Sequence, residues 1–205
     1  MRMSKRAESF NYLENWEKII NIPNNLKAAT SDEEICSLYQ SGEQLIRLQG
    51  GNLYASLGGN GLIDLTNTDK AVCLQVDLGE IYANESKYLF ASHCRMSERL
   101  KPWKSTWVIN SPVVSNKRLA PKGHPADGIF EIVEFQMTFR QSLIAYNRSK
   151  SGDHVPHPDI KLIRKKDHKG QFSKPMRLSI DGGRSIQCNY YSMQVLPHAI
   201  GILVD

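Results

Sequence analysis

The sequence lacks any long apolar run. Its longest apolar stretches, such as Ala199 to Val204, are far shorter than the roughly 20 residues that a membrane-spanning helix needs. Residues 1–10 are charged and contain no apolar core, so they do not have the pattern of a secretory signal. These absences predict a cytoplasmic location, with peripheral attachment to a membrane surface as the alternative.

Cysteine pairs are also missing. The four cysteines are widely scattered and form no CxxC pair, which favours free thiols over a disulfide framework or a cysteine metal site. Hydrophobic residues make up 40% and charged residues 23% of the 205 residues, as in ordinary globular proteins. The formal charge of +5 allows an anionic partner but does not select among nucleotide, nucleic acid and acidic membrane.

The first third of the chain mixes helical and strand patterns. Apolar residues at helical spacing predict a helix over Tyr12–Ile20, and Thr30–Glu34 has the hydroxyl and carboxylate groups expected at the start of a second helix. Leu45–Leu48 reads as a strand, followed by a tight turn at Gly50–Asn52 and a short helix.

From Ala71 onward the pattern changes to short alternating runs separated by Pro and Gly turns, which predicts a mainly β, α+β fold built on an antiparallel β-sandwich. One helix is expected within this region, over Thr138–Arg148. The strand candidates are Val72–Leu78, Tyr88–His93, Thr106–Asn110, Ile129–Phe135, Ile160–Arg164, Met176–Ile180, Ile186–Tyr191 and Ile200–Val204.

A series of short motifs runs in one order from Gly50 to Ala199 and resembles the diacylglycerol kinase and sphingosine kinase type of lipid kinase. The motifs are GGNLYASLG from Gly50, VDLG from Val76, NSP from Asn110, LAP from Leu119, PADGIFEIV from Pro125, GDHVPHPD from Gly152, IDGG from Ile180 and VLPHA from Val195.

The resemblance implies an open α/β domain followed by a β-sandwich, with ATP, Mg²⁺ and a lipid meeting in the cleft between them. Residues 1–66 would be a truncated nucleotide-binding remnant and residues 67–205 the lipid-kinase-like sandwich. The implied activity is phosphoryl transfer from ATP to a lipid hydroxyl.

Gly50, Gly51 and Asn52 are the candidate nucleotide-binding residues, because glycines let backbone amides approach a phosphate at a helix start. A tight turn that binds nothing is the alternative. The family's first glycine loop has no counterpart before Gly50.

Two carboxylates are candidates for the chemistry. Asp181 matches the family's general base, although an ordinary Asp-Gly turn explains it as well and Gly183 stands where the family has Glu. Asp127 matches a turn that resembles a metal site, and a turn that caps a strand is the alternative. Ala126 replaces the family's preceding Asp.

The densest basic segment predicts contact with anionic lipid headgroups, the alternative being a solvated strand edge. We expect no nucleic-acid partner, since no recognition helix or zinc-finger spacing accompanies the segment. The residues assigned to this lipid or membrane surface are Lys161, Arg164, Lys165 and Lys166.

Three hypotheses follow. The chain is a diacylglycerol kinase-like enzyme, or a catalytically inactive lipid- or partner-binding module derived from one, or a subunit of a homo-oligomer or hetero-complex in which another chain completes the cleft. The missing first glycine loop and Gly183 favour the second on mechanistic grounds.

Overall fold

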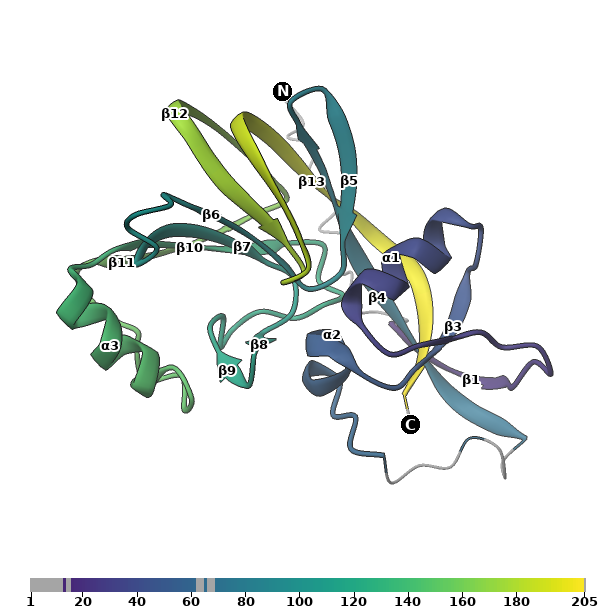
Figure 1. Cartoon of the computed structure of the whole chain (residues 1–205). Helices are drawn as coiled ribbons and strands as arrows, with labels where there is room; N and C mark the ends of the chain where they lie inside the picture. Colours follow the sequence, from purple (N-terminus) through teal and green to yellow (C-terminus); the bar gives the residue numbers. More distant parts are fainter. Residues whose placement is uncertain (1–12, 14–15, 62–64, 66–68, 205) are drawn as a thin grey trace, which may run out of the picture.

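A computed structural model describes residues 13, 16–61, 65 and 69–204 (Figure 1). Within this part, three helices accompany one large sheet and one small two-stranded sheet. The helices are α1 (Asp32–Gln40), α2 (Gly51–Ser56) and α3 (Phe139–Arg148). The strands are β1 (Glu17–Asn21), β2 (Ala28–Ala29), β3 (Leu45–Leu48), β4 (Lys70–Ala83), β5 (Ser86–Phe90), β6 (His93–Ser97), β7 (Lys104–Ile109), β8 (Val113–Val114), β9 (Lys117–Arg118), β10 (Phe130–Gln136), β11 (Ile160–Lys165), β12 (Asp167–Ile180) and β13 (Arg184–Val204).

The large sheet follows the order β1-β4-β13-β12-β6-β7-β10-β11, with β5 paired to β4. These pairings are antiparallel, whereas β3 joins β13, and β2 joins β3, in parallel. Strands β4 and β13 run through both ends of the molecule, and β13 changes register between Leu196 and Ile200. The mainly β, α+β fold class is confirmed. Part of the proposed domain boundary, residues 66–68, lies outside the described residues.

Local sequence signals explain the helix ends. Ser31 caps α1 by accepting a hydrogen bond from the Glu34 amide. Thr138 and Gln141 form a capping box at the start of α3, each side chain satisfying an amide that the helix leaves unpaired. The helix predicted to begin at Thr30–Glu34 and the helix predicted over Thr138–Arg148 are therefore confirmed.

The apolar core is divided between two ends of the molecule. One cluster packs on a face of β6, β7, β10 and β12, and a second lies beneath α1 and α2 against β3, β4 and β13. A third cluster lies on the opposite face of this part of the sheet, beneath α3. Figure 1 shows α3 at one end of the molecule and α1 with α2 at the other.

The predicted helix over Tyr12–Ile20 is wrong where it can be checked. Glu17–Asn21 forms β1, which pairs with β4 so that Ile19 lies opposite Val72. Ile19 is 75% exposed, so the helical spacing of this apolar residue did not indicate a buried helix face. The β-branched isoleucines favour a strand, and the segment forms one by pairing with the free edge of β4. Residues 12, 14 and 15 lie outside the described part.

Three strand predictions also change. The run Tyr88–His93 is divided between β5 and β6, with a break at Ala91 and Ser92. The runs Ile186–Tyr191 and Ile200–Val204 are parts of a single long strand, β13.

Replacement of Gly79 by alanine should destabilise the fold. A Cβ at this position of β4 would lie 2.1 Å from ring carbons of the fully buried Phe90. Overpacking of this kind costs about 1–3 kcal/mol. We expect Gly79→Ala to lower the free energy of unfolding by that amount in a denaturant titration.

The double variant Gly79→Ala with Phe90→Leu is the control. Because leucine lacks the ring that the new methyl group meets, the double variant should lose less stability than the sum of the two single variants. Wild-type stability of Gly79→Ala would contradict the packing around Phe90.

Candidate functional site

Asn110, directly after β7, connects the segments that carry the sequence motifs. Its side chain is 2% exposed and donates to the carbonyl oxygens of Asp77 and Ala91 at 2.8 and 2.9 Å. The hydroxyl of the next residue, Ser111, donates to the Asn52 carbonyl at 3.2 Å. The motifs that sequence analysis placed far apart are therefore joined by one buried polar network.

Asp181 occupies the turn between β12 and β13, where its own φ is 47° and that of Gly182 is 76°. Its carboxylate accepts the backbone amides of Ala91, Ser92 and His93 at 2.8, 2.9 and 2.9 Å. These amides lie at the break between β5 and β6. The Asp-Gly turn expected from sequence is present, and its carboxylate holds this break in place.

Burial raises the pKa of Asp181 to about 7, and the negative charge of Asp32 acts in the same direction. The three amide donors favour the charged form and oppose this rise. A carboxylate with a pKa near neutrality is suited to accepting a proton. Geometry limits that role, because both carboxylate oxygens already accept hydrogen bonds.

A small polar pocket of about 130 Å³ adjoins Asp181. Helix α1 forms one wall, and basic side chains of the β5 and β13 strands line another. Cys36 of α1 lies with its Sγ 3.9 Å from Asp181 Oδ2. Burial, together with the nearby Asp181 charge, strongly raises the pKa of this thiol, so Cys36 is not an activated nucleophile.

The predicted strand, glycine turn and short helix are present, with Gly50 as the N-cap of α2 and Gly51 and Asn52 as its first residues. The donor groups of this helix start face a carboxylate of the protein. Asp32 accepts the backbone amides of Asn52 and Leu53 at 2.9 and 3.0 Å and the Asn52 side-chain amide at 2.7 Å. Asp32 is 4% exposed, and burial raises its pKa while these three donors oppose the rise. The Asp32 carboxylate thus lies where an incoming phosphate would meet the start of α2.

This role of Asp32 was missed by sequence analysis, which treated the residue as part of a helix start. The signal available was a repeated strand, turn and helix: β2 leads to α1, and β3 leads to α2. Because β2 and β3 are parallel neighbours, the turns that follow them lie at the same edge. Side chains from one turn can then reach amides of the other.

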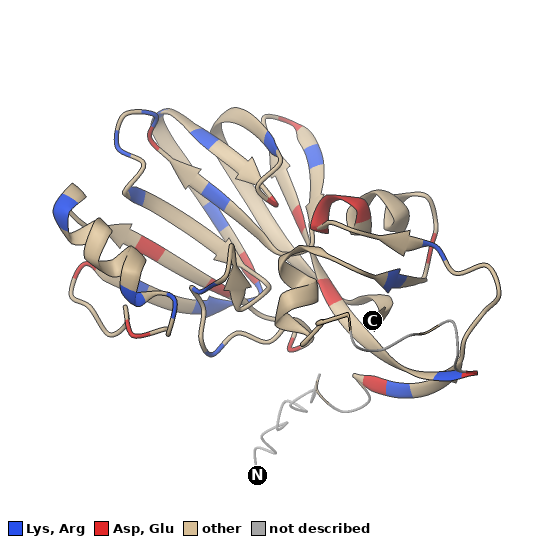
Figure 2. Ribbon diagram, turned by 60° about the horizontal axis from the view of Figure 1, so that its bottom comes forward, with Lys and Arg blue, Asp and Glu red and all other residues tan. Residues whose placement is uncertain are grey.

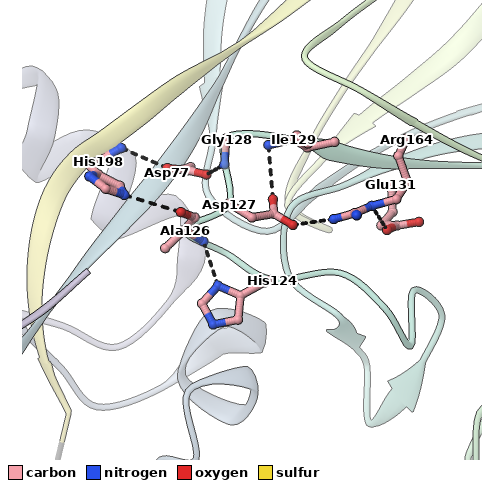
Figure 3. Close-up of polar contacts among 9 residues, drawn as sticks. All are labelled: Asp77, His124, Ala126, Asp127, Gly128, Ile129, Glu131, Arg164 and His198. Carbon is pink, nitrogen blue, oxygen red and sulfur yellow. Dashed lines mark hydrogen bonds and ion pairs between the residues drawn. The ribbon is translucent and has the colours of Figure 1, made fainter. Parts of the chain in front are cut away.

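Asp127 lies in the turn before β10, where Figure 3 shows its carboxylate between two donors. One oxygen accepts the Ile129 amide at 3.1 Å, and the other forms an ion pair with Arg164. The Arg164 Nε lies 2.6 Å from the buried Glu131. Burial raises the pKa of Asp127, while the charge of Arg164 opposes the rise.

Asp77 belongs to the VDLG motif, and the sequence analysis assigned it no role of its own. It is fully buried and accepts the amides of Gly128 and His198 at 2.7 and 2.8 Å, as drawn in Figure 3. Burial raises its pKa to about 6, against the effect of both amides. Asp77 therefore joins the turn of Asp127 to the register change in β13.

The four basic residues assigned to a lipid surface lie on β11 or immediately after it. Arg164 is engaged with Asp127 and Glu131, and Lys161 lies 4.0 Å from Glu134. Lys165 and Lys166 are exposed. All four residues are exposed, but carboxylates of the protein lie within ion-pair distance of Lys161 and Arg164. Their role at a membrane stays a prediction.

The described residues contain no group of three or more His, Cys, Asp and Glu side chains arranged to hold a metal. The Asp127 oxygens are engaged by Arg164 and the Ile129 amide, and the donors of Asn52 are engaged by Asp32. This arrangement does not fit Mg²⁺ or nucleotide phosphates at the predicted positions. The assignments of Asp127 and Gly50–Asn52 to those ligands stay predictions.

An apolar cavity of about 350 Å³ lies between α3 and the sheet, and sequence analysis did not anticipate it. Its walls combine aromatic and aliphatic side chains with a few polar groups. The main lining residues are Trp103, Trp107, Phe135, Met137, Ala145 and Tyr146.

The mostly antiparallel sheet of this protein matches the diacylglycerol kinase-like fold. A crystal structure of a diacylglycerol kinase from Bacillus anthracis str. Sterne is similar at a TM-score of 0.56 and 12% identity, over 85% of this chain and 81% of that chain. A second structure from the same organism, provisionally assigned as a diacylglycerol kinase, has a TM-score of 0.57 and 10% identity, over 85% of this chain and 82% of that one.

No protein-family model and no curated protein matches the sequence. The structural likeness confirms the expected lipid-kinase resemblance at the level of the fold. None of the helices in the described part of the chain is long and apolar enough to span a membrane.

The substitution Asp181→Asn should destabilise the protein without any ligand. Asparagine would turn an NH₂ group toward backbone amides that now donate to the carboxylate. A buried donor left without an acceptor costs about 1–3 kcal/mol. We expect a decrease of this size in the free energy of unfolding, measured by denaturant titration.

The matched control is Asp167→Asn, an exposed position at the start of β12, where we expect a change below about 0.5 kcal/mol. Equal stabilities of the Asp181 variant and the wild type would show that the three amides do not depend on this carboxylate.

Proposed function

We propose that this protein binds a lipid on a diacylglycerol kinase-like scaffold and does not transfer phosphate. The observation that carries the proposal is the apolar cavity beneath α3. Its volume of about 350 Å³ is within the range of small-molecule sites, which are lined mainly by apolar and aromatic groups with a few polar ones.

The cavity has the composition that a lipid chain requires. Trp107 and Phe135 form its floor on the sheet, and Ala145 faces it from α3. The ring of His154 also lines it, and burial lowers the pKa of that ring, which favours the neutral form. An apolar chain placed here would be removed from water, at about 0.8 kcal/mol for each buried CH₂ group.

The proposal that the protein does not transfer phosphate rests on Asp32. Its carboxylate accepts the amides at the start of α2, so a nucleotide phosphate at that place would meet a negative charge at short range. Displacing the carboxylate would leave Asp32 buried without its hydrogen-bond donors, at a cost of several kcal/mol for a buried charge.

The outer face of α3 supports access from a membrane. Phe139, Leu143 and Ile144 are each more than half exposed, although soluble helices usually turn such residues inward. Leu100, in the loop beside β7, is 84% exposed. An apolar face flanked by Arg140 and Arg148 has the composition of a segment that lies at a lipid interface.

Filling the cavity should weaken lipid binding. Ser142 lines the cavity and is partly exposed, so Ser142→Phe can place a ring in the space without deleting core contacts. We expect at least about a tenfold loss of affinity for a monoacylglycerol, equivalent to about 1.4 kcal/mol. Tryptophan fluorescence titration reports it, since two tryptophans line the cavity.

Asn147→Phe supplies the matched control, because Asn147 is exposed on the same helix and does not line the cavity. It should bind the lipid as the wild type does. Unchanged affinity in Ser142→Phe, or no binding of monoacylglycerol by the wild type, would defeat the lipid proposal.

One observation favours phosphoryl transfer as a second candidate. The pKa of Asp181 is raised to about 7, chiefly by burial, and the residue adjoins a polar pocket. A group of this pKa would suit removal of a proton from a lipid hydroxyl. The groups that would hold ATP and Mg²⁺ are the ones engaged by Asp32 and Arg164, which is why we place this candidate second.

Magnesium-ATP separates the two candidates. A ligand at about a hundred times its dissociation constant adds about 2.7 kcal/mol of stability. We expect millimolar magnesium-ATP to leave the midpoint of thermal unfolding unchanged. An upward shift, followed by transfer of phosphate to diacylglycerol, would reverse the order of the two candidates.

A further inference from the structure

The sheet face beneath α3 changes from apolar to cationic along its width. Strand pairing places Arg95 opposite Trp107, and Trp107 opposite Val133, so these side chains share one face. Arg95 is also paired with Ser179 of β12. Arg177 lies two residues before Ser179 on that strand, and therefore on the same face. The face is therefore apolar on β7 and β10 and basic on β6 and β12.

Arg95 lies at the border between the two zones. Its guanidinium stacks over the Trp107 ring at 5.0 Å and donates to the Pro102 carbonyl at 2.5 Å. Its Nε is buried and has no hydrogen-bond partner among the described residues. Arg95 and Pro102 line both the apolar cavity and an adjoining polar pocket of about 180 Å³.

Two further arginines line the polar pocket, Arg99 and Arg177. Arg177 donates to the Ser185 hydroxyl at 3.1 and 3.3 Å. In the described part of the chain, no carboxylate lies within ion-pair distance of these three arginines. Glu98 also lines the pocket, which leaves an excess of positive charge.

The charges are close enough to act on one another. Burial lowers the pKa of Arg95, and the positive charge of Arg177 adds to this effect. Ser97 and Ser179 supply hydroxyl groups to the same pocket. Figure 2 shows Lys and Arg positions spread over the strands of the α3 half, and the acidic start of α1 in the other half.

We propose that Arg95, Arg99 and Arg177 bind a phosphate monoester at the mouth of the cavity beneath α3. Planar guanidinium groups match the geometry of phosphate oxygens and form short, charge-assisted hydrogen bonds with them. The unpartnered Nε of Arg95 would gain an acceptor, and the mutual repulsion of the arginines would be relieved.

A lipid phosphate fits both zones at once, with its chain in the apolar cavity and its phosphate on the arginines. This choice of ligand rests on the proposed lipid function, whereas the phosphate site itself does not. One ligand can occupy both zones because Arg95 and Pro102 line both pockets.

Calorimetric titration with three probes tests the proposal: a lysophosphatidate, the monoacylglycerol with the same chain, and glycerol phosphate. At about 0.15 M salt, where exposed charges are screened beyond about 8 Å, we expect the lysophosphatidate to bind at least about tenfold more tightly than the monoacylglycerol. Arg177→Gln should weaken binding of both phosphate probes about tenfold and leave monoacylglycerol binding unchanged.

Arg177 is exposed, so its replacement should not impair folding, and Arg99→Gln provides a second exposed variant with the same expected effect. Lys169→Gln makes the same change of charge at an exposed position on β12 outside the polar pocket, and its affinities should equal those of the wild type.

The outcomes are distinct. Equal binding of glycerol phosphate and lysophosphatidate, both dependent on Arg177, would support the phosphate site and identify a water-soluble ligand. Binding of glycerol phosphate without any binding of monoacylglycerol would remove the lipid function alone. Equal affinities for lysophosphatidate and monoacylglycerol, or wild-type phosphate binding in both arginine variants, would overturn the proposal.

Discussion

The side-chain amide of Asn110 holds together the segments on which the rest of the structure depends. It donates to carbonyl oxygens of β4 and of the break between β5 and β6, two backbone segments that do not pair with each other at this point. A buried carbonyl without a donor would cost about 1–3 kcal/mol. One asparagine therefore satisfies two such groups and fixes the distance between the two segments.

The buried carboxylates extend this network by the same principle. Asp32, Asp77 and Asp181 each accept backbone amides from a turn or break that is distant in sequence. In each case burial raises the pKa of the acid and the amides oppose the rise. Asp77 and Asp181, which belong to the motifs of the resemblance, thus hold distant backbone segments together, a structural task that needs no bound ATP.

The sequence predicted those parts of the fold that local signals determine. The hydroxyl and carboxylate groups at Thr30–Glu34 and the periodicity of Thr138–Arg148 predicted two helices correctly. The β1 segment was misread because isoleucine at helical spacing also suits an edge strand. The contact of Asp32 with Asn52 could not be read from spacing, since it depends on the parallel pairing of β2 and β3. The cavity depends on where α3 docks, which periodicity does not specify.

Helix α3 is attached to the sheet with little apolar burial. Within the helix, Ala145 is the buried residue, and the side chains of Leu143 and Ile144 are more than half exposed. Polar contacts hold the helix: Gln141 donates to Asp159 at 2.8 Å, and the Lys117 ammonium lies 3.7 Å from the centre of the Tyr146 ring. A helix that buries little apolar area adds little to the cost of local opening. The sheet below it is packed on its other face by the main core, which supports the strands that carry Arg95 and Trp107.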